Sequence, residues 1–172
     1  LKNPDKGAVM LHLYFGSGKG KTTAAAGLAL RALGHGKKVV VVQFLKDGTS
    51  GEIEPLRRLG AAVFACPNAK FTWLMTPQEK AAALAHNTKT LETALQMPCD
   101  LLILDEACAA LRAALLPEAL LHKAVLNAPY EVVLTGRDPA DWMLQNADYI
   151  TEFTARRHPY EKGIPAREGI EY

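Results

Sequence analysis

Near the start of the chain, a glycine-rich octapeptide sharply limits which folds are possible. Its members are Gly16, Ser17, Gly18, Lys19, Gly20, Lys21, Thr22 and Thr23. It follows an apolar run at 10–15 and opens an alanine- and leucine-rich segment at 24–33. A strand, a glycine loop and a helix that begins at a Lys-Thr pair form the context of a phosphate-binding loop. The octapeptide therefore predicts a site for the phosphates of a nucleotide.

The residue types of this loop suit contact with phosphate. Its glycines allow successive backbone N–H groups to point inward, and the helix that follows adds its positive N-terminal end. Lys21 supplies a point charge for the terminal phosphates, and the Thr22 hydroxyl is placed to bind Mg²⁺. The alternative is a glycine-rich turn with a chance Gly-Lys-Thr. Three alternating glycines and two lysines between a strand and a helix disfavour that alternative.

The loop departs from the usual pattern G-x-x-x-x-G-K-[ST] at one position. The fifth residue before Gly20 is Phe15, and Gly16 comes one residue later. The sequence thus predicts a shortened or altered phosphate loop, in which we expect Gly18 to restore flexibility.

Apolar runs and helix signals alternate along the rest of the chain. Strands are predicted at 10–15, 39–44, 61–65, 100–106, 131–135 and 149–153. Helices are predicted at 21–33, 53–59, 76–96, 107–115, 117–126 and 138–147. Four consecutive valines at 39–42 indicate a strand buried on both faces. The pattern predicts an α/β fold that is P-loop NTPase-like, with a mostly parallel central sheet and helices on both faces.

Composition limits the class of protein further. At 172 residues the chain is predicted to be a single P-loop α/β domain spanning 1–172. A net charge of +2 predicts no nucleic-acid partner, and the lack of a long apolar run predicts no membrane span. The polar start at 1–6 is too short for a signal peptide. Three cysteines without metal-type spacing favour a reducing, cytoplasmic location and a role as small buried hydrophobes.

Polar residues follow several predicted strands, at the edge of the sheet where ligands bind in such folds. Gln43 and Lys46 follow the second strand, Asp105 and Glu106 end the fourth, and Arg137 follows the fifth. An acid at the end of a buried strand beside a phosphate loop holds Mg²⁺ through water. The alternative is that the two acids cap the helix that follows.

These residues are compatible with several reactions. The absence of an N-K-x-D element favours ATP over GTP weakly. A hydrolase would use Glu106 to polarise water, whereas a kinase would bring an acceptor hydroxyl. A transferase that acts at the ribose would release the whole triphosphate.

Several stretches taken together are similar to one family. They are GSGKGKTTAA at 16–25, RALGHGKKV at 31–39, VQFLK at 42–46, FTW at 71–73, TGR at 135–137 and KGIPAREGIEY at 162–172. On these motifs the chain resembles the P-loop type of ATP:corrinoid adenosyltransferase, the cob(I)yrinic acid a,c-diamide adenosyltransferase family. The resemblance extends from about residue 6 to residue 172.

The resemblance implies that the Co(I) centre of a corrinoid attacks the 5′ carbon of ATP. The 5′-deoxyadenosyl group is then transferred and triphosphate is released, in adenosylcobalamin biosynthesis or salvage. The resemblance also implies ATP bound in the reverse direction along the loop, dependence on Mg²⁺, a homodimer and a flavoprotein reductant as partner. A generic P-loop ATPase or small-molecule kinase is the alternative, and a non-catalytic nucleotide or corrinoid carrier is a third hypothesis.

The residue types suit this chemistry. No protein base is needed, because Co(I) is itself a powerful nucleophile. Catalysis would come from holding and neutralising the triphosphate, for which the cationic candidates are Lys19, Lys21 and Arg137. The candidates for metal coordination are Thr22 and Glu106, with Asp105 behind them.

The resemblance assigns two aromatic residues to the corrinoid. Phe71 and Trp73 would fill the lower face of the corrin and exclude its axial ligand, which makes Co(II) easier to reduce. An apolar wedge would disfavour water or a base at cobalt through desolvation. The alternative is that both are core aromatics, which is the usual position of such residues.

Overall fold

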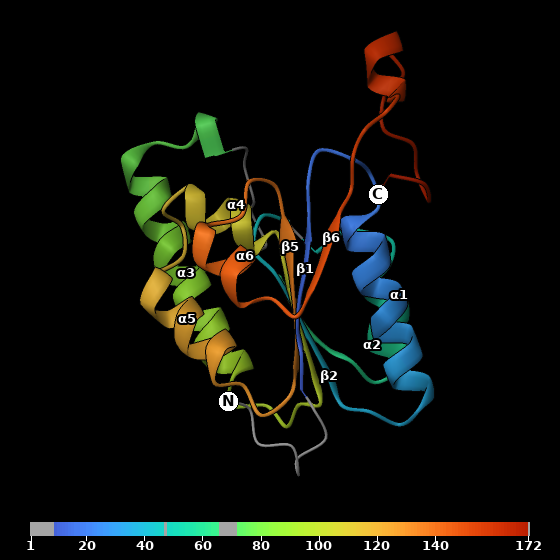
Figure 1. Ribbon diagram of the computed structural model, residues 1–172. Coiled ribbons are helices and arrows are strands. Elements are labelled where there is room, and N and C mark those ends of the chain that lie inside the picture. The colour runs from blue at the N-terminus through green and yellow to red at the C-terminus, as the bar shows by residue number, and fades with distance from the viewer. Residues whose placement is uncertain (1–8, 47, 66–71, 172) are drawn as a thin grey trace.

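The computed structural model describes residues 9–46, 48–65 and 72–171, which form a parallel sheet flanked by helices (Figure 1). Its six strands lie in the order β3-β2-β4-β5-β1-β6, and every neighbouring pair runs parallel. They are β1 (Leu11–Phe15), β2 (Val39–Gln43), β3 (Ala62–Ala65), β4 (Leu101–Asp105), β5 (Glu131–Gly136) and β6 (Tyr149–Glu152). The predicted α/β, P-loop NTPase-like class is confirmed.

Helices cover both faces of this sheet, and Figure 1 separates them into two groups. One face carries α1 (Lys21–Gly34) and α2 (Ile53–Arg58). The opposite face carries α3 (Pro77–Ala94), α4 (Ala107–Arg112), α5 (Glu118–Leu126) and α6 (Asp141–Asn146). Two short 3₁₀ helices, η1 (Thr72–Leu74) and η2 (Pro159–Lys162), complete the described elements.

The central strands are apolar along their whole length because each contributes to two cores. Successive side chains of a strand point to opposite faces of the sheet. Val39 and Val41 therefore pack with Ala25 of α1 in one core. Val40 and Val42 pack in the other core, on the side of α3 to α6. The valine run thus confirms the prediction of a strand covered on both faces.

The start of α3 follows the predicted capping chemistry. The Glu79 amide donates to Thr76 Oγ1 at 3.2 Å, and the Thr76 amide donates to Glu79 Oε2 at 2.9 Å. The helix then begins at Pro77, whose missing N–H costs nothing in the first turn.

Two helix boundaries differ from the prediction because residues with left-handed backbone conformations cannot continue a helix. Ala114 has a φ of 56°, and α4 ends at Arg112 rather than near 115. Asp138 has a φ of 50° and pairs with Arg112, so α6 begins at Asp141 rather than at 138.

The described cysteines are shielded thiols. Cys108 is buried, and its Sγ lies 3.7 Å from Met143 Sδ. Burial raises the pKa of Cys108 to about 12 and that of the half-buried Cys99 to about 11. Both side chains are therefore neutral near pH 7, and the buried-hydrophobe prediction is confirmed for Cys108. Cys66 lies outside the described residues.

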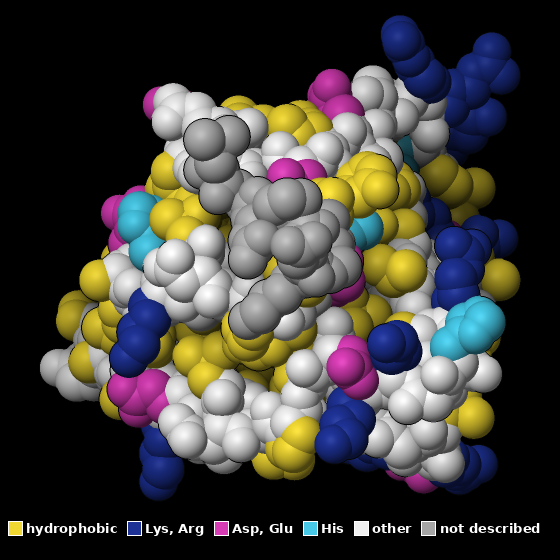
Figure 2. Space-filling model, turned by 60° about the horizontal axis from the view of Figure 1, so that its bottom comes forward, with side chains coloured by type: hydrophobic (Ala, Val, Ile, Leu, Met, Phe, Trp, Pro, Cys, Tyr) yellow, Lys and Arg dark blue, Asp and Glu magenta, His cyan; other side chains and the backbone are white. Residues whose placement is uncertain are grey.

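The surface on the side of the amino ends of the strands has a mixed character. Figure 2 shows acidic, basic and apolar side chains interspersed on this face. This agrees with the small net charge of +2. Within the described ranges, no helix combines the length and apolarity that crossing a bilayer demands.

Candidate active site

The phosphate loop lies between β1 and α1 and packs against the chain that leaves β6. Gly16 and Gly20 have φ values of 110° and 118°, which residues with a side chain rarely adopt. A Cβ on Gly16 would lie 2.6 Å from the Phe153 carbonyl oxygen, and one on Gly20 would lie 3.1 Å from the Phe153 ring. Both positions need glycine for backbone conformation and for space.

Gly18 is required for a different reason from the expected one. Its amide donates to the Phe153 carbonyl oxygen, and a Cβ there would lie 2.8 Å from that oxygen and from its carbon. We expected Gly18 to restore flexibility to the altered loop. Its contacts instead fasten the loop to Phe153, so close packing is the physical reason for this glycine.

Lys21 is folded back over the loop. Its Nζ donates to the carbonyl oxygens of Gly16 and Gly18 at 2.7 and 2.8 Å, and only 8% of the residue is exposed. Burial lowers the pKa of Lys21, and the charges of Glu106 and Asp105 partly offset this effect. The ammonium group is thus held at the loop, where phosphate oxygens can replace the two carbonyls.

Asp105, at the end of β4, is the centre of a buried network that joins three strands and the loop. Its Oδ1 accepts hydrogen bonds from Thr22 Oγ1 at 2.9 Å and Thr135 Oγ1 at 2.6 Å. Its Oδ2 accepts from Lys46 Nζ at 2.8 Å and Gln43 Nε2 at 3.2 Å. The residue is only 1% exposed. A buried carboxylate requires such partners, because burial removes its solvation by water.

Glu106 follows directly and reaches the cleft through an uncommon backbone conformation. Its φ of 59° lies in the left-handed region, and its amide donates to Thr135 Oγ1 at 3.0 Å. Burial, followed by the charge of Asp105, raises the pKa of Glu106. Its side chain makes no capping hydrogen bond to α4. The helix-cap alternative therefore fails for Glu106.

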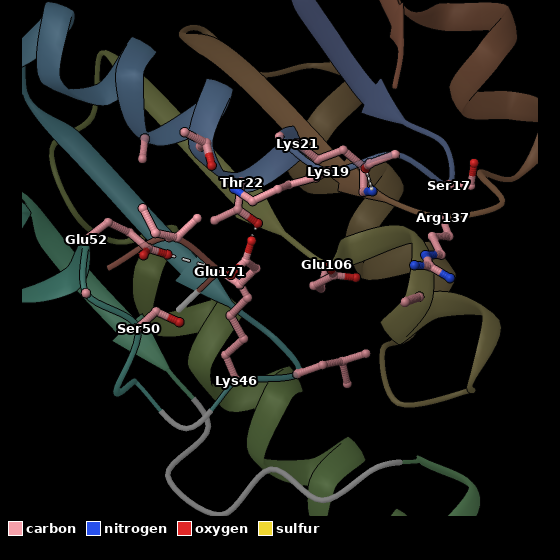
Figure 3. A pocket seen from close by; sticks show the side chains of 18 of the residues that line it. Ser17, Lys19, Lys21, Thr22, Lys46, Ser50, Glu52, Glu106, Arg137 and Glu171 are labelled. Atoms are coloured by element: carbon pink, nitrogen blue, oxygen red, sulfur yellow. Dashed lines mark hydrogen bonds and ion pairs between the residues drawn. The ribbon is translucent and has the colours of Figure 1, made fainter. Parts of the chain in front are cut away.

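A cleft of about 1250 Å³ opens at the carboxyl ends of the strands. Figure 3 shows side chains around this cavity that come from the start of α1 and from the segments after β2, β4 and β5, namely Lys21, Thr22, Lys46, Glu106 and Arg137. Pockets for small ligands usually measure roughly 300–1,000 Å³. The cleft therefore has room for more than a nucleotide.

Trp73 of η1 lines the same cleft and is 74% exposed. The core-aromatic alternative is therefore wrong for Trp73. The neighbouring Leu74 also lines the cleft and is 64% exposed. Phe71 lies outside the described residues, so its position stays a prediction.

Among the described residues, a metal in this cleft would find few protein ligands. Across the described part of the chain, no three His, Cys, Asp or Glu side chains gather closely enough to hold an ion. Mg²⁺ commonly binds through one or two carboxylates with waters and substrate phosphates. The Thr22 hydroxyl and the Glu106 carboxylate, both on the cleft, fit that pattern.

The sequence matches one family model over almost its full length. Residues 7–172 match the model described as ATP:corrinoid adenosyltransferase BtuR/CobO/CobP. The chain belongs to this family.

Curated relatives agree with the match to the ATP:corrinoid adenosyltransferase family. A corrinoid adenosyltransferase of Pseudomonas aeruginosa is 35% identical over 176 residues, covering 98% of this chain and 85% of that protein. One from Escherichia coli K12 is 36% identical over 168 residues, covering 93% and 84%. Corrinoid adenosyltransferase CobA of Salmonella typhimurium is 37% identical over 169 residues, again covering 93% and 84%.

In this member of the adenosyltransferase family, the position of the cleft could be predicted from the sequence, but many of the contacts that hold its residues could not. The partners of Asp105 include Gln43 and Thr135, which lie 62 and 30 residues away. Their position at strand ends signalled a place near the site, but gave no sign of a shared partner. His158 and Glu171 also line the cleft from the C-terminal segment. Glu171 lies in the family-like stretch at 162–172, but neither residue had been assigned a role.

Proposed function

We propose that this chain transfers the 5′-deoxyadenosyl group of ATP to the Co(I) centre of a corrinoid and releases triphosphate. Membership in the ATP:corrinoid adenosyltransferase family supports this reaction. The structural observation that carries the proposal is one cleft that joins the phosphate loop to the exposed Trp73. A nucleotide tail and an apolar macrocycle would thus meet in a single cavity.

The reaction depends on stabilising the negative charge of its triphosphate leaving group, and it needs no protein base. The electron pair of Co(I) forms the new cobalt–carbon bond, and the 5′ carbon–oxygen bond breaks with its electrons going to triphosphate. Cations that stabilise this charge lower the barrier. Lys21 at the loop and Arg137 after β5 line the cleft for that role, together with Lys19. ATP would lie in the reverse direction along the loop, so that its 5′ carbon faces the corrinoid.

We propose that Thr22 and Glu106 hold Mg²⁺ with the triphosphate, and that Asp105 supports them from behind. When bound, the ion would supply positive charge to the phosphate oxygens. Thr22 Oγ1 donates its proton to Asp105 Oδ1, so its lone pairs can face a cation. The buried Asp105 carboxylate thereby orients the hydroxyl.

We propose that Trp73, with Phe71, covers the lower face of the corrin. Adjacent exposed apolar side chains in a groove are typical of ligand-binding sites, and Trp73 and Leu74 both line this cleft. Packing against the macrocycle would keep water and bases from the cobalt.

A generic P-loop ATPase or small-molecule kinase is not favoured, because the family match covers residues 7–172 and not the phosphate loop alone. A non-catalytic carrier predicts binding without turnover. We further propose a homodimer, a flavoprotein as the source of electrons and a cytoplasmic location, which follow from the resemblance and the cysteine pattern.

The experiment combines the protein with ATP, Mg²⁺ and chemically reduced cobalamin in the dark. The expected result is a visible spectrum that changes to that of an alkylated, light-sensitive corrinoid, with one triphosphate released per corrinoid. Formation of ADP or inorganic phosphate without a change at cobalt would support the ATPase or kinase alternative instead. Tight binding of both substrates without any product would support a carrier.

A further inference from the structure

Lys46 lies among the oxygen atoms that the proposed metal would need. Its Nζ is 2.8 Å from Asp105 Oδ2, 3.1 Å from Thr22 Oγ1 and 3.9 Å from Glu52 Oε1. Figure 3 shows its side chain extending from the loop after β2 towards Thr22. The ammonium group thus lies where two carboxylates and the loop hydroxyl converge.

The surrounding contacts hold these oxygens in place. Gln43 Nε2 donates to Glu52 Oε1 and to Asp105 Oδ2, both at 3.2 Å, so one amide fixes the two carboxylates relative to each other. Gln43 is 2% exposed and Asp105 is 1% exposed, whereas the side chains of Lys46 and Glu52 are 25% and 28% exposed. Gln43 and Asp105 are therefore held in place, whereas the Lys46 ammonium group can move towards the cleft.

Mg²⁺ on Thr22 and the ammonium group of Lys46 exclude each other in this position. Mg²⁺ binds oxygen at about 2.0–2.1 Å in an octahedral shell that usually includes several waters. Such a shell beside Thr22 Oγ1 and Asp105 would fill the space in which Nζ now contacts both residues. Two cations so close would also repel each other.

We propose that Lys46 is a built-in counter-cation for Asp105 that Mg²⁺ displaces when MgATP binds. This inference rests on the Mg²⁺ site proposed above. Before the nucleotide arrives, Lys46 neutralises the buried carboxylate and keeps divalent cations from binding alone. After exchange, the freed ammonium group lies on the cleft that receives the triphosphate. Metal binding is thereby coupled to nucleotide binding.

The test measures divalent cation binding without nucleotide, with Mn²⁺ as the probe and electron paramagnetic resonance as the readout. Lys46→Met removes the competing charge, and Lys46→Gln removes the charge but can still donate to Asp105. Both variants should bind Mn²⁺ at least tenfold more tightly than the unsubstituted protein. Thr22→Val added to Lys46→Met should abolish this gain. Lys37→Met, an exposed lysine away from the cleft, should leave Mn²⁺ affinity unchanged.

A second readout guards against variants that fold poorly. Because Lys46→Met leaves Asp105 with less positive charge nearby, added Mg²⁺ should raise its melting temperature more than that of the unsubstituted protein. Mn²⁺ affinity that is equal or weaker in both Lys46 variants would overturn the inference and leave Lys46 a structural partner of Asp105. That result is independent of the proposed reaction, since adenosyl transfer by the unsubstituted protein is measured separately at cobalt.

Discussion

At the scale of single residues, the site is a small set of charges whose positions are fixed by distant parts of the chain. Asp105 accepts four hydrogen bonds, and Thr22 and Gln43 reach it across 83 and 62 residues of sequence. The types of these residues could be predicted to matter, because they follow strands. The network itself could not, since no local pattern encodes contacts between strand ends.

Lys21→Ala should weaken ATP binding severely. The variant loses the ammonium group that is held at the loop by Gly16 and Gly18. A charge-assisted hydrogen bond contributes about 1.5–3 kcal/mol, which corresponds to a loss of roughly 10- to 100-fold in affinity. Isothermal titration calorimetry with ATP measures the effect, and Lys37→Ala, far from the cleft, is the charge-matched control. Unchanged affinity in Lys21→Ala would refute the loop assignment.

Glu106→Gln should stabilise the protein at neutral and alkaline pH. Burial raises the pKa of Glu106 above its ordinary value of 4.5, so the folded state holds this proton more tightly than the unfolded state. Stability from this group is complete below the unfolded-state pKa and is lost as pH rises through the folded-state pKa. The variant removes that loss, so its melting temperature should exceed that of the parent at pH 8.

The advantage of Glu106→Gln should shrink as the pH falls towards 4.5, the ordinary pKa of the group. Thermal melts across this range test the expectation without substrate. Glu92→Gln, on the exposed side of α3, provides the comparison for a general loss of one negative charge. A variant that is less stable than the parent at pH 8 would contradict the proposed penalty at Glu106.

At the scale of elements, the phosphate loop is shaped by β6 as much as by β1 and α1. The strands and helices could be predicted because hydrophobic periodicity and caps are local signals, as at Thr76 and Glu79. The start of α6 differs from the prediction because Asp138 adopts a left-handed backbone conformation, with a φ of 50°, that no local signal indicated. Equally, nothing near Gly18 in sequence indicates that Phe153 packs against it.

Gly18→Ala should destabilise the fold and weaken ATP binding. Its Cβ would lie 2.8 Å from the Phe153 carbonyl group, so either the loop or the strand end must shift. Overpacking of this kind costs about 1–3 kcal/mol. Chemical denaturation gives the change in the free energy of unfolding.

Gly27→Ala is the matched control for that substitution. A Cβ on Gly27, within α1, would meet nothing within 4 Å. Because alanine favours helix, this change should be stabilising by up to about 1 kcal/mol. If Gly18→Ala were as well tolerated as Gly27→Ala, the loop would not depend on its contact with Phe153.

At the scale of the whole molecule, the parallel sheet brings the ends of β1, β2, β4 and β5 to one edge, and η1 adds Trp73 to the cleft there. The location of this edge could be predicted from the alternation of strands and helices. The place of Trp73 in the cleft was expected from the family resemblance alone, because by residue type an aromatic side chain is usually buried. That residues 1–172 form a single domain stays a prediction.

Trp73→Ala should impair the reaction at the corrinoid while leaving ATP binding nearly unchanged. Since Trp73 is proposed to contact the corrin and not the phosphates, ATP affinity should stay within about twofold. Activity that starts from Co(II) with a weak reductant should fall at least tenfold, and activity from chemically produced Co(I) should fall less. Phe71→Ala should behave in the same way, whereas Tyr160→Ala, 79% exposed on η2, should not. Full Co(II)-dependent activity in Trp73→Ala would contradict the proposal that Trp73 covers the lower face of the corrin.

The most direct test of the central claim follows the 5′ carbon of ATP itself. ATP labelled with ¹³C at that carbon is incubated with the protein, Mg²⁺ and reduced cobalamin, and the products are examined by ¹³C and ³¹P magnetic resonance. We predict that the label becomes a cobalt-bound methylene that is lost on illumination, while the phosphorus appears as intact triphosphate. Label that stays in ADP, with phosphate or a phosphorylated acceptor as the other product, would contradict the account.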